Sequence, residues 1–317
     1  MRVLAGDIGG TKTWLGLFED GRELREAALP SAEYDGLGEA VAEFLGGERV
    51  DAAAFGIAGP VQGRVVRTTN LPWVIDADAL EAAHALGPVR LLNDFHALAL
   101  GLDRLGEGAR VVLQEGEVDP GGPVVVIGAG TGLGKAVIVP TGEAEPRVLS
   151  SEGGHRDFAP RDALDAELLT WLRAELGGRV SVERVVSGLG LASLYRFLVE
   201  EGHAEGALEA PDGAEIAAAR ETDLAARMAL ERFVSLYGAE AGNLALEVLA
   251  KGGLYVAGGI APKLHDDLGE GFGVRFLEAF ADKGRMRPLL EKTRVTLVTE
   301  PKVGLLGAAR AAGATPG

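Results

Sequence analysis

Two short glycine-rich segments constrain the fold of this 317-residue chain more than any other feature. Each lies between two short runs rich in apolar and β-branched residues: GDIGGTKT (6–13) between VLA (3–5) and WLGLFE (14–19), and GAGTGLG (128–134) between VVVI (124–127) and AVIV (136–139). Such runs are typical of strands, and glycine permits the tight turn that joins them. The sequence therefore predicts a duplicated unit of strand, turn and strand.

The second glycine segment matches neither common nucleotide-binding fingerprint. Its glycines fall at 128, 130, 132 and 134, out of step with the G-x-G-x-x-G of dinucleotide-binding turns. A Walker loop ending at Gly134 and Lys135 would need glycine at 129 and Ser or Thr at 136, and both positions are alanine. Both segments are therefore interpreted as hairpins whose backbone N–H groups form nests for the phosphates of a nucleotide.

Polar residues beside the two turns suit a magnesium nucleotide. Thr11 and Thr131 carry hydroxyl donors, and Asp7 precedes the glycines of the first turn. A carboxylate there can order the water shell of Mg²⁺. The alternative for Asp7 is an Asx-turn that caps the hairpin.

Length and composition favour an ordinary globular protein of two domains. The 31 basic and 47 acidic residues give a net charge of −16, which argues against nucleic acid or an anionic membrane as partner. Cysteine is absent, which excludes disulfides and thiolate metal sites, and five scattered histidines do not form a zinc site. No segment has the length of a membrane span or the pattern of a signal peptide, so we expect a cytoplasmic location.

The order of strand and helix patterns indicates an α/β fold. In the first hundred residues we expect strands near 2–6, 13–18, 24–28, 51–58 and 89–92, and helices near 37–46, 77–86 and 95–102. Helical spacing then dominates 162–176, 188–200 and 222–249, with a surface loop at 200–215. A final strand, LYVAGGIAP (254–262), ends in a third glycine turn before a helix.

Asn93 and Asp94 follow the apolar end of an expected strand in LLNDFHALAL (91–100). Open α/β sheets bind ligands at the carboxyl ends of their strands. A carboxylate at this position can accept the proton of a substrate hydroxyl, as phosphoryl transfer to an alcohol requires. The alternative for Asp94 is a cap at the start of the following helix.

Two further acidic segments are less informative by pattern alone. Glu152 and His155 flank two glycines in SSEGGHRDFAPRD (150–162), a loop whose polar residues would usually lie at the surface. Glu183 falls in the first turn of a helix expected to open at SVERVVSGLG (181–190), where the helix dipole alone favours a carboxylate.

The motifs as a set resemble those of the bacterial glucokinase family that lies outside the repressor/kinase sugar family. In chain order they are GDIGGT, LNDFHA, GAGTGLG, EGGHRDFAP, ERVVSGLGL, AGGIAP and GLLGAA, and they cover nearly the whole chain. The resemblance implies the two-domain actin/hexokinase-like ATPase fold, whose duplicated halves supply two phosphate turns that meet across a cleft. It implies a small α/β domain at 1–104 plus 299–317 and a larger, helix-rich α/β domain at 105–298.

The resemblance also implies an activity and a set of site residues. The reaction is phosphorylation of D-glucose at its 6-hydroxyl by Mg²⁺·ATP in a cytoplasmic homodimer. Asp94 is the general base, Asn93 binds sugar hydroxyls, and Glu152, His155 and Glu183 bind the hydroxyls at the other end of the sugar. The nucleotide-binding residues are Gly6, Asp7, Ile8, Gly9, Gly10, Thr11, Gly130, Thr131 and Gly132 for the phosphates, and Gly258 and Gly259 on the adenosine side.

Neighbouring families provide the alternatives. Members of the repressor/kinase sugar family hold zinc with a histidine and a cysteine cluster and carry an N-terminal helix-turn-helix, whereas this chain has no cysteine and begins at the first phosphate strand. We therefore expect no zinc and no repressor function. A kinase for another hexose, such as mannose, stays open because a fold does not fix its substrate. A non-catalytic ATP-dependent regulator of the actin/Hsp70 type is disfavoured because it would not need a set of sugar-binding residues.

Overall fold

The chain divides into two compact units, which are described separately. The computed structural model describes residues 1–68, 71–84, 86–143 and 146–313. The first unit comprises Met1–Ala109, Val148–Ser150 and Glu300–Gly317, and the second comprises Arg110–Arg147 and Ser151–Thr299.

A five-stranded sheet forms the centre of the first unit, in the order β3-β2-β1-β4-β7. Its strands are β1 (Arg2–Ile8), β2 (Lys12–Glu19), β3 (Arg22–Pro30), β4 (Ala52–Ile57) and β7 (Val89–Asn93). β1 and β2 form the predicted antiparallel hairpin, whereas β4 and β7 run parallel to β1. The short strands β5 (Val65–Arg67) and β6 (Val74–Asp76) form a separate pair.

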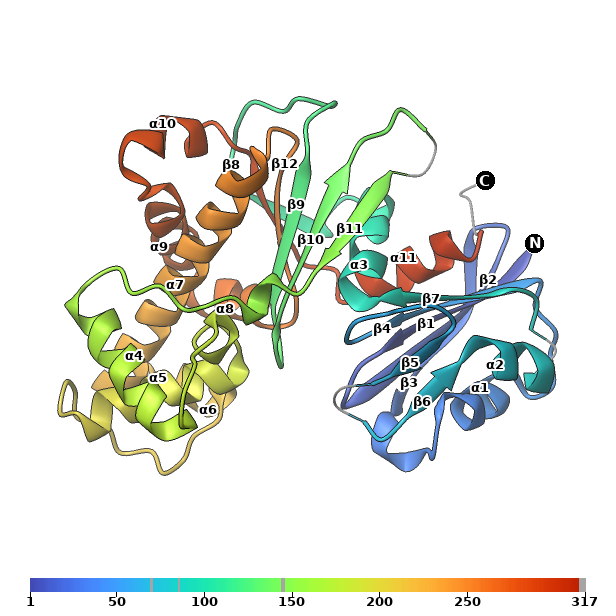
Figure 1. The fold of residues 1–317 in the computed structure, drawn as a ribbon, viewed down its shortest axis with the longest axis horizontal. Coiled ribbons are helices and arrows are strands. Elements are labelled where there is room, and N and C mark those ends of the chain that lie inside the picture. The colour runs from blue at the N-terminus through green and yellow to red at the C-terminus, as the bar shows by residue number, and fades with distance from the viewer. Residues whose placement is uncertain (69–70, 85, 144–145, 314–317) are drawn as a thin grey trace. The chain divides into compact units, whose positions relative to one another are not determined.

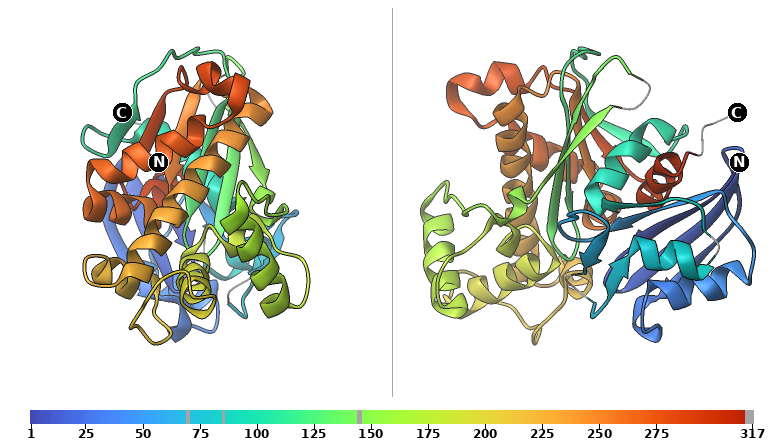
Figure 2. Two further views of the ribbon diagram at one scale, coloured as in Figure 1. Left: turned by 90° about the vertical axis from the view of Figure 1, so that its left-hand side faces the viewer. Right: turned by 45° about the vertical axis from the view of Figure 1, so that its right-hand side comes forward.

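Helices cover both faces of this sheet because its central strands are apolar on both sides. The pair α1 (Leu37–Leu45) and α2 (Ala77–His84) covers one face, and the pair α3 (Asp94–Gly101) and α11 (Val303–Ala311) covers the other (Figures 1 and 2). Glycine lets α3 and α11 approach closely, since a Cβ atom at Gly307 would lie 1.7 Å from the Ala97 carbonyl oxygen. Two 3₁₀ turns complete the unit, η1 (Ser31–Glu33) and η2 (Leu102–Arg104).

The second sheet repeats the plan of the first, with the order β11-β10-β9-β12-β13-β8. Its strands are β8 (Arg110–Gln114), β9 (Val124–Ala129), β10 (Leu133–Val139), β11 (Arg147–Ser151), β12 (Gly253–Ala257) and β13 (Val295–Val298). β9 and β10 form the second predicted antiparallel hairpin, and β12 and β13 continue the sheet in parallel to β9. The predicted duplication is therefore confirmed at the level of both hairpins.

Helices and 3₁₀ turns make up most of the rest of the second unit. The helices are α4 (Ala163–Leu176), α5 (Gly188–Glu200), α6 (Gly213–Ala219), α7 (Leu224–Val248), α8 (Ile260–Leu268), α9 (Glu270–Ala281) and α10 (Arg287–Leu290), and the turns are η3 (Gly153–His155), η4 (Val182–Arg184) and η5 (Gly284–Met286). The buried strand residues Val125 and Ile127 pack in one apolar core with α5, α7 and α9.

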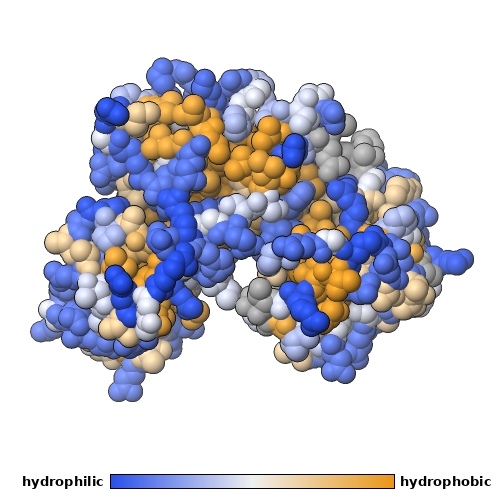
Figure 3. Space-filling view, viewed as in Figure 1, coloured by the Kyte–Doolittle hydropathy of each residue, from blue (hydrophilic) through white to orange (hydrophobic). Residues whose placement is uncertain are grey.

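A surface pocket of about 360 Å³ in the second unit contains none of the predicted site residues. It is lined by Leu249, Leu289 and Leu290 together with Lys251 and Lys292. Apolar residues also reach the surface in the upper part of this unit, where Figure 1 labels α10 and β8 (Figure 3). Within the described residues, no helix has the length and apolar character needed to cross a membrane.

The third glycine turn follows its strand as expected, and three other expectations differ from the structure. The strand in LYVAGGIAP (254–262) ends at Ala257, just before the expected glycine turn, because Gly258 adopts a left-handed conformation and α8 begins two residues later. This strand, expected to be the final one, is not the last, since β13 follows it. Glu183 lies in the 3₁₀ turn η4 and not in the first turn of a helix, because α5 begins only at Gly188. The helix expected at 77–86 is described to His84, and residue 85 lies outside the described residues.

Candidate active site

The first glycine turn, between β1 and β2, is braced by buried hydroxyl groups. The Gly9 N–H donates to the Lys12 carbonyl oxygen at 3.0 Å, which closes the turn. Ser31 Oγ donates to the Gly9 carbonyl oxygen at 2.9 Å and lies 2.9 Å from Thr13 Oγ1. Because both hydroxyl side chains are fully buried, the turn rests on a neutral hydrogen-bonded support.

Asp7 lies near the end of β1, with its carboxylate against the start of α11. A Cβ atom at Gly304 would lie 2.6 Å from Asp7 Oδ2, so only glycine leaves room for the carboxylate there. Burial raises the pKa of the Asp7 carboxyl to about 6. The Asx-turn alternative finds no support, since among the described residues no backbone N–H donates to the Asp7 side chain. The closing GLLGAA segment thus supplies the glycine that accommodates Asp7.

Asn93 and Asp94 lie at the junction of β7 and α3, as the sequence predicts. Asn93 is the N-cap: its Oδ1 accepts from the N–H groups of Phe95 at 3.1 Å and His96 at 3.2 Å. Its Nδ2 donates to the Gly59 carbonyl oxygen at 3.1 Å. The N-cap considered for Asp94 is therefore its neighbour, while Asp94 Oδ1 shares the Phe95 N–H, at 2.9 Å. Asp94 is the first helical residue, where the helix dipole favours the charged carboxylate.

The second glycine turn, between β9 and β10, is held by a carboxylate. The Gly130 N–H donates to the Gly132 carbonyl oxygen at 2.8 Å. The Leu133 N–H donates to Glu183 Oε2 at 2.9 Å. A Cβ atom at Gly132 would lie 2.4 Å from the same Oε2 atom. Glycine at 132 therefore makes room for Glu183 against the turn.

Glu152, His155 and Glu183 come together in the second unit, although Glu183 is separated from the other two by helix α4. His155 Nε2 lies 3.8 Å from Glu152 Oε2, and His155 Nδ1 lies 3.8 Å from Glu183 Oε1. Glu183 is the least exposed of the three, at 26%. The structure thus forms a cluster of two carboxylates and an imidazole, which are groups suited to binding sugar hydroxyls.

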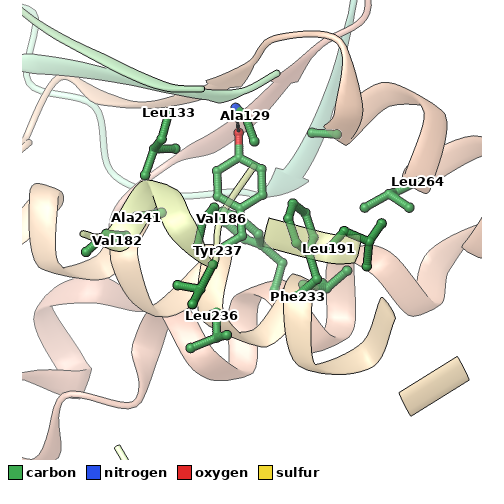
Figure 4. Close-up of a cluster of buried hydrophobic side chains, with 14 of the residues drawn as sticks. Ala129, Leu133, Val182, Val186, Leu191, Phe233, Leu236, Tyr237, Ala241 and Leu264 are labelled. Atoms are coloured by element: carbon green, nitrogen blue, oxygen red, sulfur yellow. Dashed lines mark hydrogen bonds between the residues drawn. The ribbon is translucent and has the colours of Figure 1, made fainter. Parts of the chain in front are cut away.

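The third glycine turn joins β12 to α8 and packs against the end of β9. Gly258 has φ of 82°, and a Cβ atom there would lie 2.6 Å from the Ala129 carbonyl oxygen. The buried Tyr237 hydroxyl accepts from the Ala129 N–H at 3.0 Å (Figure 4). The same hydroxyl lies 3.3 Å from the Ala257 carbonyl oxygen. Tyr237 therefore links the strand ends that lead into two of the glycine turns.

Tyr237, Lys135 and Glu240 are further buried residues of this region that no sequence motif marks as functional. Lys135 is 2% exposed and Glu240 is 4% exposed, and they form an ion pair between β10 and α7. Burial lowers the pKa of the Lys135 ammonium, and the Glu240 carboxylate opposes this effect. In the sequence, this ion pair is indicated only by a lysine within the otherwise apolar strand β10.

Comparison with known proteins identifies the family. The family model described as Glucokinase matches residues 4–315. A glucokinase from Synechocystis sp. is 41% identical, over 98% of this chain and 97% of its own length. The crystal structure of a glucokinase from an Antarctic psychrotroph is 32% identical and covers 99% of both chains with a TM-score of 0.84.

A more distant structure has the same fold. The ROK family glucokinase from Streptomyces griseus, in complex with glucose and AMPPNP, is 24% identical over 98% of this chain and 99% of its own, with a TM-score of 0.68. The expected actin/hexokinase-like fold is thereby confirmed. The chain therefore belongs to the glucokinase family and is a kinase that phosphorylates glucose.

Proposed function

We propose that this chain transfers the γ-phosphoryl group of ATP to the 6-hydroxyl of D-glucose, with Asp94 as general base. The observation that carries the proposal is the cluster of Glu152, His155 and Glu183, in which Glu183 is also hydrogen-bonded to the second glycine turn. A sugar-binding carboxylate and a phosphate-binding turn in direct contact are the parts that a sugar kinase requires.

The glycine turns are proposed to bind the nucleotide. Turn residues 10, 11, 131 and 132 are proposed to present backbone N–H groups, and Thr11 and Thr131 their hydroxyls, to phosphate oxygens, while the N–H groups of Gly9 and Gly130 close the turns. Gly258 and Gly259 lie at the N-terminus of α8 and are assigned to the adenosine side. The glucokinase from Streptomyces griseus supports ATP as donor because it binds the ATP analogue AMPPNP together with glucose.

Asp7 suits Mg²⁺ bound through water. Mg²⁺ is held in such sites by one or two carboxylates, several waters and the substrate phosphates. Asp7 is a largely buried carboxylate beside the first glycine turn, packed against Gly304 where a larger residue would displace it. When bound, Mg²⁺ neutralises charge on the phosphates. The role of Asp7 is to orient waters of that ion.

Asp94 is proposed to accept the proton of the 6-hydroxyl as its oxygen attacks the γ-phosphorus and ADP leaves. In phosphoryl transfer the base mainly orients the nucleophile, because the transition state is loose and carries its charge on the phosphoryl oxygens. Asn93 holds its amide rigidly through the helix cap and Gly59. Since an amide group has two N–H donors and one is used by Gly59, the second is assigned to a sugar hydroxyl.

The hexose is proposed to be selected by Glu152, His155 and Glu183. A site that hydrogen-bonds hydroxyls rejects an analogue that leaves its own polar groups unpaired. Mannose and other hexoses are therefore the competing substrates to test.

A coupled assay of ADP formation tests the proposal, with glucose, mannose or no sugar, and with NMR identification of the product. We expect ADP formation that depends on added sugar, highest kcat/KM for glucose, and phosphate on the 6-oxygen. ADP formation at the same rate without sugar, or phosphate on another oxygen, would contradict it.

A further inference from the structure

Lys135 follows the second glycine turn, but this turn does not match the Walker motif, in which a lysine at that place binds phosphate. The Lys135 ammonium instead contacts the segment that carries Glu152 and His155. We propose that Lys135 is a positioning residue for the sugar loop, defined as residues 152–155. Its Nζ holds the Gly153 carbonyl oxygen at 3.0 Å and thereby places Glu152 and His155 on either side. The inference rests on the proposed function, because it assumes that these two residues bind the sugar.

Gly153 is held at both of its backbone groups. Its N–H donates to Ser151 Oγ at 3.0 Å, while its carbonyl oxygen accepts from Lys135 Nζ and, at 3.4 Å, from the Arg156 N–H. The Arg156 contact is long for a hydrogen bond, so the ammonium is the stronger donor to this carbonyl. The position of the sugar loop therefore depends on a side chain from β10.

One strand serves both parts of the sugar-binding cluster. The Leu133 N–H at the start of β10 binds Glu183, and Lys135, two residues further along, binds the sugar loop. The loop also packs directly on this strand, since a Cβ atom at Gly154 would lie 2.1 Å from the Leu133 carbonyl oxygen. Strand β10 thus sets the spacing between Glu183 and the sugar loop.

The contacts of Glu240 indicate which group would lose its main partner if the Lys135 ammonium were removed. Glu240 Oε2 accepts from Arg156 Nη2 at 3.1 Å and from Asn243 Nδ2 at 3.0 Å. The Glu240 carboxylate would therefore keep partners if Lys135 lost its charge. The Gly153 carbonyl would lose its strong donor, so the structural effect of removing the ammonium falls on the sugar loop.

The test compares Lys135→Met with Arg232→Met in the full-length enzyme. Arg232 is a matched control because it also pairs with a buried carboxylate, Asp165, at 2.7 Å, and that carboxylate keeps a second cation, Arg161. Both variants are expected to lower the melting temperature. Only Lys135→Met is expected to raise KM for glucose, by about tenfold, because misplaced binding groups weaken substrate binding by this factor or more. KM for ATP should stay within about twofold of wild type in both variants.

Hydrogen exchange gives a readout that is independent of turnover. In Lys135→Met we expect faster exchange in a peptide covering 152–156, and no such change in Arg232→Met. If Lys135→Met does not fold, Lys135→Met combined with Glu240→Met replaces the buried ion pair by apolar side chains, which buried sites often tolerate. That double variant is expected to fold and to keep the raised glucose KM.

The outcomes are distinct. A glucose KM equal to wild type in the folded Lys135 variants, or an equal rise in Arg232→Met, would overturn the positioning role. Absence of sugar-dependent ADP formation in the wild-type enzyme would instead refute the proposed function on which the inference rests.

Discussion

The two hairpin turns share a sheet plan but are supported by different chemistry. In the first unit, the turn between β1 and β2 rests on the neutral hydroxyls of Ser31 and Thr13. In the second unit, the turn between β9 and β10 contacts the carboxylate of Glu183, and β10 continues to the buried ion pair of Lys135 with Glu240. The two units thus share the strand pairing, while the side chains around their turns differ.

The difference indicates a division of labour between the units. In the first unit, the strand ends carry Asp7 and Asp94, which we assign to the magnesium nucleotide and to proton transfer. In the second unit, the turn is connected through side chains to Glu152, His155 and Glu183, which are three of the four residues assigned to sugar hydroxyls. Changes at Asp7 or Asp94 should therefore affect turnover, and changes around the second turn should affect glucose binding.

The largest effect is expected from Asp94→Asn. Loss of a positioned general base typically lowers turnover by about 10²–10⁴-fold, and the amide is of similar size to the carboxylate. Steady-state kcat with glucose measures the loss, and the melting temperature provides the control for folding. A kcat near that of wild type would remove Asp94 from the mechanism.

Glu183→Ala should affect the sugar rather than the nucleotide. Loss of a charge-assisted hydrogen bond costs roughly 1.5–3 kcal/mol, which is about a ten- to hundredfold decrease in kcat/KM for glucose. KM for ATP should change much less, although the Leu133 N–H also loses its acceptor. Glucose kinetics that match wild type would return Glu183 to a structural role and weaken the assignment of Glu152 and His155.

Gly132→Ala tests the role of Glu183 in glucose binding without removing a polar group. Its new methyl group would lie 2.4 Å from Glu183 Oε2 and must displace the carboxylate, whereas a methyl group at Gly130 meets nothing within 4 Å. We expect Gly132→Ala to raise KM for glucose by about five- to tenfold, as a small misplacement of a binding group would. Gly130→Ala is the matched control for glucose KM, and an equal rise in both variants would contradict the steric argument.

The smallest effect is expected from Ser31→Ala in the first unit. The variant loses the bond to the Gly9 carbonyl oxygen and the contact with Thr13 Oγ1. The free energy of unfolding should fall by about 1–2 kcal/mol, with KM for glucose unchanged. Urea denaturation and glucose kinetics measure the two quantities. A large rise in glucose KM would show that the first turn also supports the sugar site.

The hairpins could be predicted from local sequence patterns, because glycine permits tight turns and β-branched residues favour the strands beside them. The strand β13 (VTLV, 295–298) was missed because four apolar or β-branched residues carry too little periodicity to be recognised. The start of α5 was misplaced because Ser187, and not a residue near Glu183, provides the N-cap, with its Oγ accepting from the Gly190 N–H at 3.1 Å.

The candidate site was predictable only in part from the residues themselves. Asn93 and Asp94 follow from their place at a strand end, whereas Glu152, His155 and Glu183 required the family resemblance. The pairing of Lys135 with Glu240 spans 105 residues, and no local pattern connects them. Pairings at such separations arise from the packing of α7 against the sheet, which only the three-dimensional structure provides.

Isothermal titration of glucose into the wild-type enzyme, Asp94→Asn and Glu183→Ala tests the division of labour most directly. We predict that Asp94→Asn binds glucose within about threefold of the wild-type Kd, because its main contribution arises in the transition state, and that Glu183→Ala binds at least about tenfold more weakly. Equal weakening in both variants, or weakening confined to Asp94→Asn, would contradict the account.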